Sequence, residues 1–243
     1  IGGDCFALYA PRGSADVVAY NGSGRAPAAA DAGWYAERGI RHIERGSPHA
    51  VTVPGAVDAW ARLIADHGSR ELGELLQPAI RHARDGYPVY SRTADDWACE
   101  RAVLARQVNT RALFMPAGRV PGVGEVHRQP LLAATLQAIA ERGRDAFYFG
   151  AVADDIVNHL RSLGGLHTLE DFATASGEYV TPIATDYRGA RVYECPPNGQ
   201  GLAALLMLNV LDGLSSDPGV PGSAARFHLQ MEAKRLAYAA RDR

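Results

Sequence analysis

The chain has 243 residues, of which 47% are hydrophobic and 21% are charged, and its formal net charge at pH 7 is −2. These values are typical of a globular protein, and the length allows one large domain or two small ones. Positive charges are scattered along the chain, which argues against a nucleic-acid partner, because phosphate binding requires a basic surface. The longest apolar run, residues 202–211, is about half the length that a membrane-spanning helix needs, so no membrane partner is expected.

Residue spacing also argues against metal and cofactor sites. The eight histidines never follow a zinc-binding spacing, and no glycine pattern typical of nucleotide phosphates is present. The three cysteines, Cys5, Cys99 and Cys195, lie far apart, which indicates reduced thiols rather than disulfides or a zinc site. We therefore expect no metal and no cofactor. Reduced thiols favour a cytoplasmic location, with the periplasm or secretion as alternatives.

Short strands and turns are predicted for residues 1–53. Two β-like runs, residues 5–10 and 16–20, flank the turn composition Pro-Arg-Gly-Ser, which predicts a hairpin. The chain starts in a strand-like stretch at Ile1 and stops within a helical pattern. We therefore expect a piece of a longer gene product, with any signal peptide upstream.

Helices are predicted to dominate from Val53 onward. A Gly/Pro-rich loop is expected at residues 116–128, and two strands, 178–187 and 190–195, are expected around the tight turn Arg188–Gly189. Apolar spacing and Gly or Pro boundaries predict helices at 54–68, 72–86, 93–106, 129–143 and 151–165, from about Gly201, and at 227–243.

Three loops concentrate glycine and polar residues: "IGGDCF" at residues 1–6, "NGSGRAP" at 21–27 and "PPNGQG" at 196–201. No GxSxG nucleophile turn is present, because the glycines near Ser23 directly flank it instead of lying two residues away on each side. Each loop has two interpretations. Glycine provides the positive φ of a turn, or it lets the backbone approach a bound ligand closely.

The order of these loops and the segments between them resembles the large subunit of the γ-glutamyltransferase family over the whole chain. The most specific segments are "LAATLQAIAERGRDAFYFG", "TLEDFA", "YRGARVYECPP" and the final helix "EAKRLAYAARDR". The resemblance implies an α+β fold, the four-layer αββα sandwich of N-terminal nucleophile hydrolases. Residues 1–243 are expected to be the large-subunit portion of one such domain, which a separate small subunit from the same precursor completes.

The resemblance also implies the mechanism. The nucleophile is expected to be a Thr that self-cleavage exposes at the N-terminus of the small subunit, so this chain carries no catalytic residue and is inactive alone. An α-amino group titrates at about 7.7–8.0 and can act as the base for its own hydroxyl, so no His–Asp pair is required. The substrate is expected to be a small amide with a carboxylate, cleaved through an acyl-enzyme.

Two residues are candidates for substrate binding, Arg25 and Ser23. In family members that cleave γ-glutamyl groups, an arginine four residues before the loop proline binds the donor carboxylate. Here that position is Ser23, and the arginine is Arg25, two residues later. Arg25 either meets a substrate carboxylate from another angle or braces the loop through backbone carbonyls.

Asn198 and Gln200 occupy the place of a Ser/Gly-rich family segment, where Asn198 either caps the following helix or contacts substrate. Ser23 and Asp4 place the chain in a divergent branch similar to γ-glutamyltransferase-like amidohydrolases and cephalosporin acylases. The alternatives are a true γ-glutamyltransferase that hydrolyses glutathione and, in another class, an unprocessed, non-catalytic binding protein.

Overall fold

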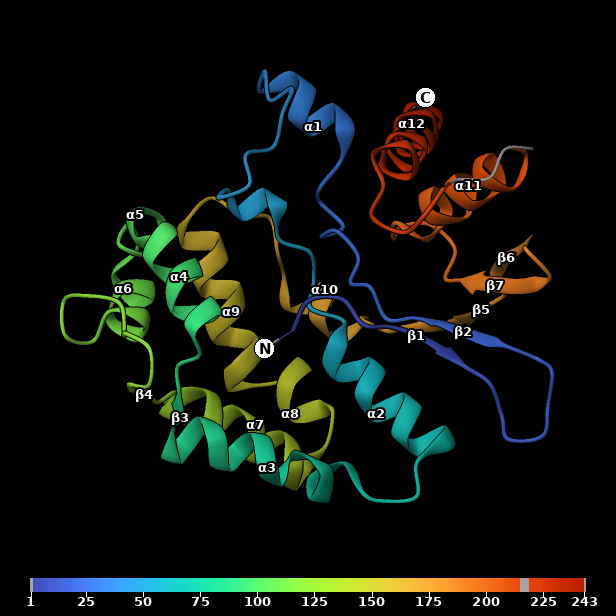
Figure 1. The fold of residues 1–243 in the computed structure, drawn as a ribbon. Coiled ribbons are helices and arrows are strands. Elements are labelled where there is room, and N and C mark those ends of the chain that lie inside the picture. The colour runs from blue at the N-terminus through green and yellow to red at the C-terminus, as the bar shows by residue number, and fades with distance from the viewer. Residues whose placement is uncertain (1, 215–218, 243) are drawn as a thin grey trace. The chain divides into compact units, whose positions relative to one another are not determined.

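The computed structural model describes residues 2–214 and 219–242 (Figure 1). The chain divides into two compact units. One unit, called here the helical unit, contains residues 60–173. The other, called the loop unit, combines residues 2–59 with residues 174–242. Each is described by itself. No helix of the described ranges is long and apolar enough to cross a membrane.

The loop unit contains two antiparallel sheets. A three-stranded sheet has the order β1-β2-β5, and its first two strands are the predicted hairpin, with Phe6 opposite Asn21. A second hairpin, β6 and β7, turns at Arg188 and Gly189, which both adopt positive φ values of 50° and 82°. The strands of this unit are β1 (Phe6–Tyr9), β2 (Val18–Asn21), β5 (Glu178–Val180), β6 (Ile183–Tyr187) and β7 (Ala190–Glu194).

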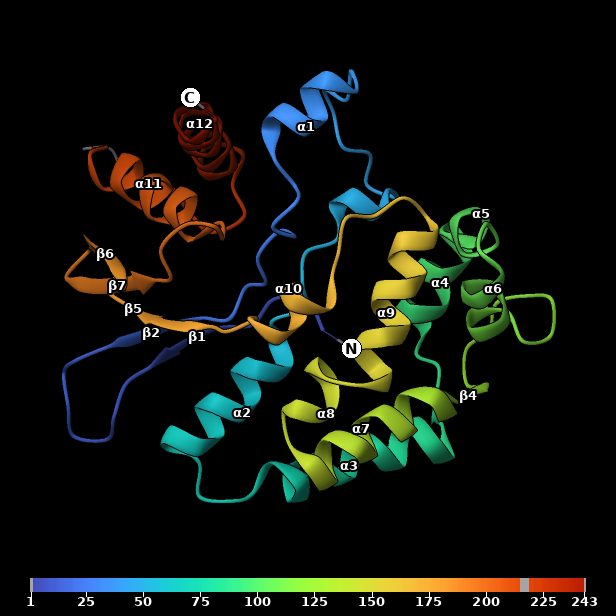
Figure 2. The same ribbon diagram turned by 180° about the vertical axis from the view of Figure 1, so that it is seen from behind.

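Helices α11 (Gly201–Asp212) and α12 (Ala224–Arg241) of the same unit pack on each other and lie side by side in both views (Figures 1 and 2). Ser223 is the N-cap of α12, and its side chain accepts a hydrogen bond from the Arg226 amide. The predicted strand over 178–187 is instead two strands, because Pro182 interrupts it. The helical segments of the loop unit are α1 (Ala32–Glu37), a 3₁₀ turn (Pro48–Ala50), α11 (Gly201–Asp212) and α12 (Ala224–Arg241).

The helical unit is built around the pair α3 and α7, which lie side by side in both views (Figures 1 and 2). Gly73 permits this contact, since a Cβ there would lie 2.5 Å from the carbonyl oxygen of Ala140. Phe147, Tyr148 and Phe172 are at most 1% exposed and form much of the core. Helix α2 (Ala56–His67) leads from the loop unit. Besides three short helices between α3 and α7, the unit contains α3 (Leu72–Asp85), α7 (Pro130–Arg142), α8 (Asp145–Tyr148), α9 (Ala151–Ser162) and α10 (Leu169–Ala173).

The prediction of one helix over 93–106 is wrong. Three short helices take its place: α4 (Ser91–Cys99), α5 (Arg101–Leu104) and α6 (Val108–Phe114). The ring of Trp97 packs 5.4 Å from Phe114 and 5.0 Å from His127, so aromatic packing requires the chain to turn between α4 and α6.

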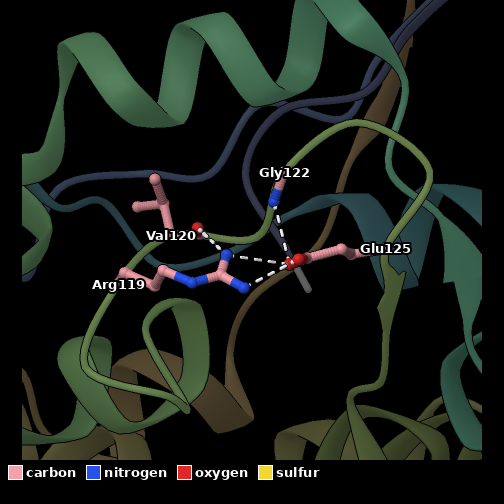
Figure 3. A network of polar contacts seen from close by, with 4 residues as sticks. All are labelled: Arg119, Val120, Gly122 and Glu125. Atoms are coloured by element: carbon pink, nitrogen blue, oxygen red, sulfur yellow. Dashed lines mark hydrogen bonds and ion pairs between the residues drawn. The ribbon is translucent and has the colours of Figure 1, made fainter.

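The Gly/Pro-rich loop predicted for residues 116–128 is present, although its last residues pair as a short strand. Strand β4 (Val126–His127) pairs with β3 (Tyr87–Pro88). Figure 3 shows how the loop is closed: the Arg119 guanidinium donates to both carboxylate oxygens of Glu125, at 2.7 and 3.0 Å. The amide of Gly122 donates to the same carboxylate.

Candidate functional site

The first two glycine loops meet the start of α2 through backbone hydrogen bonds, all within the loop unit. The carbonyl of Gly3 accepts from the amides of Gly55 and Ala56, both at 2.9 Å. The amide of Val53 donates to the carbonyl of Arg25 at 2.9 Å. These bonds fix the loops at residues 2–5 and 21–25 against the segment that begins α2.

Glycine is required in these loops mainly by close contact. A Cβ on Gly24 would lie 1.4 Å from the carbonyl oxygen of Val53, and one on Gly55 would lie 2.2 Å from that of Gly22. The interpretation of positive φ fits Gly3, whose φ is +88°, but not Gly22 or Gly24, which do not adopt positive φ. The close approach is to this chain's own backbone.

Ser23 lies at the centre of a polar cluster. Its hydroxyl donates to the Asp4 carboxylate at 2.9 Å, and its amide donates to the Asn21 side-chain oxygen at 3.0 Å. The Asn21 amide group in turn donates to the Asn198 oxygen at 3.3 Å. Residues of all three glycine-rich loops therefore join one hydrogen-bonded network: Asp4, Asn21, Ser23 and Asn198. We call these four residues, together with Arg25 of the second loop, the loop cluster.

Asn198 does not cap the helix that follows it. Helix α11 begins at Gly201 after Gln200, whose side chain makes no capping bond, and Asn198 instead accepts from Asn21. The capping interpretation is therefore wrong. The asparagine ties the turn before α11 to strand β2.

The Arg25 side chain is 81% exposed and lies 3.7 Å from Glu178, which is 59% exposed. Glu178 begins β5 opposite Asn21, so the sheet register brings it beside this loop. The contact that the structure gives the guanidinium is this ion pair, and the loop's backbone bond to Val53 comes from the Arg25 carbonyl. An exposed pair of this kind is weak, so the guanidinium is accessible to another anion.

Asp58 is a buried support of this site that its sequence context does not reveal. Its position in the first turn of α2 suggests only a favourable interaction with the helix dipole. In the structure it is 8% exposed, and it accepts from the Gly177 amide at 2.8 Å and from the Tyr20 hydroxyl at 3.4 Å. These bonds join α2, β2 and the approach to β5. The sequence gives one indication that Asp58 is buried: its neighbours Ala56, Val57 and Ala59 are all apolar.

The thiols near the loop cluster are poor nucleophiles. All three cysteines are free. Burial raises the pKa of Cys5, and burial followed by the nearby charge of Glu194 raises the pKa of Cys195. Both thiols are therefore protonated at neutral pH, and the cluster offers groups that bind and orient rather than groups that attack.

Comparison with solved structures defines the class of protein. The chain matches the cephalosporin acylase from Bacillus halodurans with a TM-score of 0.86 and 39% identity, over 98% of this chain and 45% of that one. The fold is that of the large subunits of N-terminal nucleophile hydrolases, which confirms the expected fold class.

Curated relatives and a family model identify the family. The chain is 36% identical over 242 residues to the glutathione hydrolase-like YwrD proenzyme of Bacillus subtilis, covering 100% of this chain and 46% of that protein. It is 34% identical over 248 residues to the oxamate amidohydrolase proenzyme of Klebsiella pneumoniae, with coverage of 100% and 46%. The family model described as gamma-glutamyltranspeptidase matches residues 1–243. The chain belongs to this family, and it spans less than half the length of these relatives.

Proposed function

We propose that this chain is the large subunit of a self-processing amidohydrolase or acyltransferase, whose partner is a small subunit from the same precursor. The observation that carries the proposal is the family match over all 243 residues, together with relatives that are named proenzymes. A cytoplasmic location is part of the same proposal.

The proposed chemistry requires no catalytic side chain from this chain. The hydroxyl of the small subunit's N-terminal Thr attacks the amide carbonyl carbon while its α-amino group takes the hydroxyl proton. The carbon–nitrogen bond then breaks, the proton passes to the leaving amine, and an ester remains on the Thr. Water or an acceptor amine attacks that ester and releases the acyl group.

The loop cluster supplies the binding of the donor's acyl part in this proposal. The Arg25 guanidinium exchanges its weak pair with Glu178 for the substrate carboxylate, which it binds with two parallel hydrogen bonds. Ser23 occupies the family's arginine position. Its hydroxyl donates its one hydrogen to Asp4, so it offers the substrate an acceptor oxygen. Asp4 also places a negative charge beside Ser23, so we expect a donor with one carboxylate directed at Arg25.

A panel of donor anilides tests the proposal on the full-length, processed protein. Glutaryl, γ-glutamyl and butyryl p-nitroanilide share one leaving group and differ in charge. Arg25→Ala is expected to raise KM for glutaryl anilide about tenfold or more, because a charge-assisted pair is lost, and to leave butyryl anilide unchanged. Glu178→Gln is expected to lower KM for glutaryl anilide, since it releases the guanidinium.

Arg191→Ala is the matched control, because Arg191 forms an exposed pair with Asp186 at the same distance of 3.7 Å. If Arg25→Ala raises KM equally for the charged and the neutral anilides, Arg25 does not bind the substrate carboxylate. Absence of anilide cleavage in a processed protein with an N-terminal Thr would contradict the amidohydrolase proposal itself.

A further inference from the structure

The helical unit contains a groove that is lined by none of the loop-cluster residues. It has a volume of about 520 Å³ and is lined by α6, β4 and the start of α7, including Leu113, Pro116, Val126, His127 and Leu131. Small-molecule pockets usually have volumes of about 300–1,000 Å³. The groove is therefore large enough for a small ligand.

Large apolar side chains are exposed on and beside this groove. Leu131 is 83% exposed and Val126 is 50% exposed, and both line it. Val108, at the start of α6, is 68% exposed. Burial of such side chains under an apolar ligand is favourable, because it removes their surface from water.

His127 adds a buried polar group whose hydrogen-bonding capacity is unused. It is 2% exposed, and its Nε2 has no hydrogen-bond partner among the described residues. Its ring is held by Trp97 at 5.0 Å, by the stacked ring of Phe114 at 5.9 Å and by Tyr87 at 5.9 Å. Because the ring is buried among these aromatic side chains, His127 contributes an aromatic wall to the groove.

The segment that builds the groove has more basic than acidic residues. Residues 109–131 contain three arginines and one acid, Glu125, which Arg119 and the Gly122 amide already bind (Figure 3). Arg128 lines the groove, and a Cβ on Gly86 would lie 2.8 Å from its Cγ, so the Arg128 stem is packed against the backbone.

Asp85, at the end of α3, is an acid that interacts with the charge of Arg128. Arg84 holds the Asp85 carboxylate through two hydrogen bonds, of 2.9 and 3.3 Å, and Arg128 adds only a weaker charge interaction that also lowers the pKa of Asp85. Arg128 therefore brings positive charge to an apolar groove and has no hydrogen-bonded acid in the described part of the chain.

We propose that this groove binds a small amphipathic carboxylate, with its apolar part against Leu113, Val126 and Leu131 and its carboxylate at Arg128. The charge of the segment selects an anion, and the planar guanidinium suits a carboxylate. The volume and the exposed apolar rim select a short hydrocarbon body. None of the residues that line the groove belongs to the loop cluster, so the test of this proposal does not depend on the proposed reaction.

Calorimetric titration of the full-length protein with octanoate, octylammonium and 1-octanol tests the proposal, because the three probes share one hydrocarbon chain. Octanoate is expected to bind saturably with one site per protein, and octylammonium at least tenfold more weakly. Arg128→Gln is expected to weaken octanoate about tenfold and leave 1-octanol unchanged. Leu131→Gln is expected to weaken the binding of octanoate and of 1-octanol roughly five- to tenfold.

Two matched variants at exposed positions away from the groove act as controls. Arg142→Gln, at the other end of α7, and Leu75→Gln, on α3, are expected to leave all three titrations unchanged. The proposal is overturned if octanoate shows no saturable binding, if octylammonium binds equally well, or if Arg142→Gln weakens octanoate as much as Arg128→Gln. The first of these results is also the one expected if another part of the protein covers the groove.

Discussion

Replacement of Gly24 by alanine is the most direct perturbation of the loop cluster. The added Cβ would lie 1.4 Å from the carbonyl oxygen of Val53, 2.6 Å from its carbonyl carbon and 3.4 Å from the Gly55 amide nitrogen. All three are backbone atoms, so no change of rotamer relieves the clash. The loop must move away from the segment that leads into α2.

The size of the effect follows from two terms. Separation of the segments breaks the 2.9 Å bond from the Val53 amide to the Arg25 carbonyl, a net loss of about 0.5–1.5 kcal/mol. Overpacking with a forced backbone shift costs about 1–3 kcal/mol more. We therefore expect the free energy of unfolding to fall by about 2–4 kcal/mol.

Urea unfolding of the full-length protein measures this loss, with Gly199→Ala as the control. Gly199 belongs to the third glycine-rich loop, but a Cβ there would meet no atom within 4 Å and its φ is not positive. The control is expected to leave stability unchanged or to raise it by up to about 1 kcal/mol. If Gly24→Ala unfolds at the same urea concentration as Gly199→Ala, the close contact is not a determinant of the fold and the reasoning is refuted.

Three further predictions follow from charged and titratable groups. Asp58→Ala is expected to lower the free energy of unfolding by about 2–3 kcal/mol, because the half-buried Gly177 amide and the buried Tyr20 hydroxyl lose their acceptor. Chemical denaturation measures this loss, and an unchanged midpoint would contradict it. Burial lowers the pKa of His127, so the stability it contributes is complete above about pH 6.5 and is lost as pH falls below that value. Chemical unfolding at pH 8 and pH 5 measures this effect. Between these pH values, His127→Phe is expected to lose less of its free energy of unfolding than the unchanged protein. The ion pair with Arg119 and then the Gly122 amide lower the pKa of Glu125 to about 2, so its carboxylate is charged at pH 7. Glu125→Gln is therefore expected to speed hydrogen exchange of the Gly122 amide at pH 7. Equal exchange in both proteins would contradict the Gly122–Glu125 hydrogen bond.

Local signals predicted the hairpins and the long helices well. Turn residues placed next to β-like runs specify β1–β2 and β6–β7, and both hairpins are present as antiparallel pairs. The helices α3, α7 and α9 begin and end close to the residues that their Pro and Gly boundaries indicate. The break between α4 and α6 was missed because ring packing of Trp97 on His127 causes it, and these residues are 30 positions apart.

The candidate site was predictable in its members but not in its geometry. Glycine-rich composition marked the three loops, and the structure joins them through Asp4, Ser23 and Asn198. Neither the Asp58 bond to Gly177 nor the pairing of Arg25 with Glu178 has a local signal, because each joins segments more than 100 residues apart. The roles of Arg25 and Ser23 in substrate binding stay predictions.

The central claim is that this chain is one product of a self-cleaved amidohydrolase precursor. The measurement that tests it most directly is the intact mass, under denaturing conditions, of the protein expressed from the full-length gene. We expect two chains, the larger containing residues 1–243 and the smaller beginning with Thr. A single uncut chain, or a smaller chain without an N-terminal Thr, would contradict the claim and favour a non-catalytic binding protein.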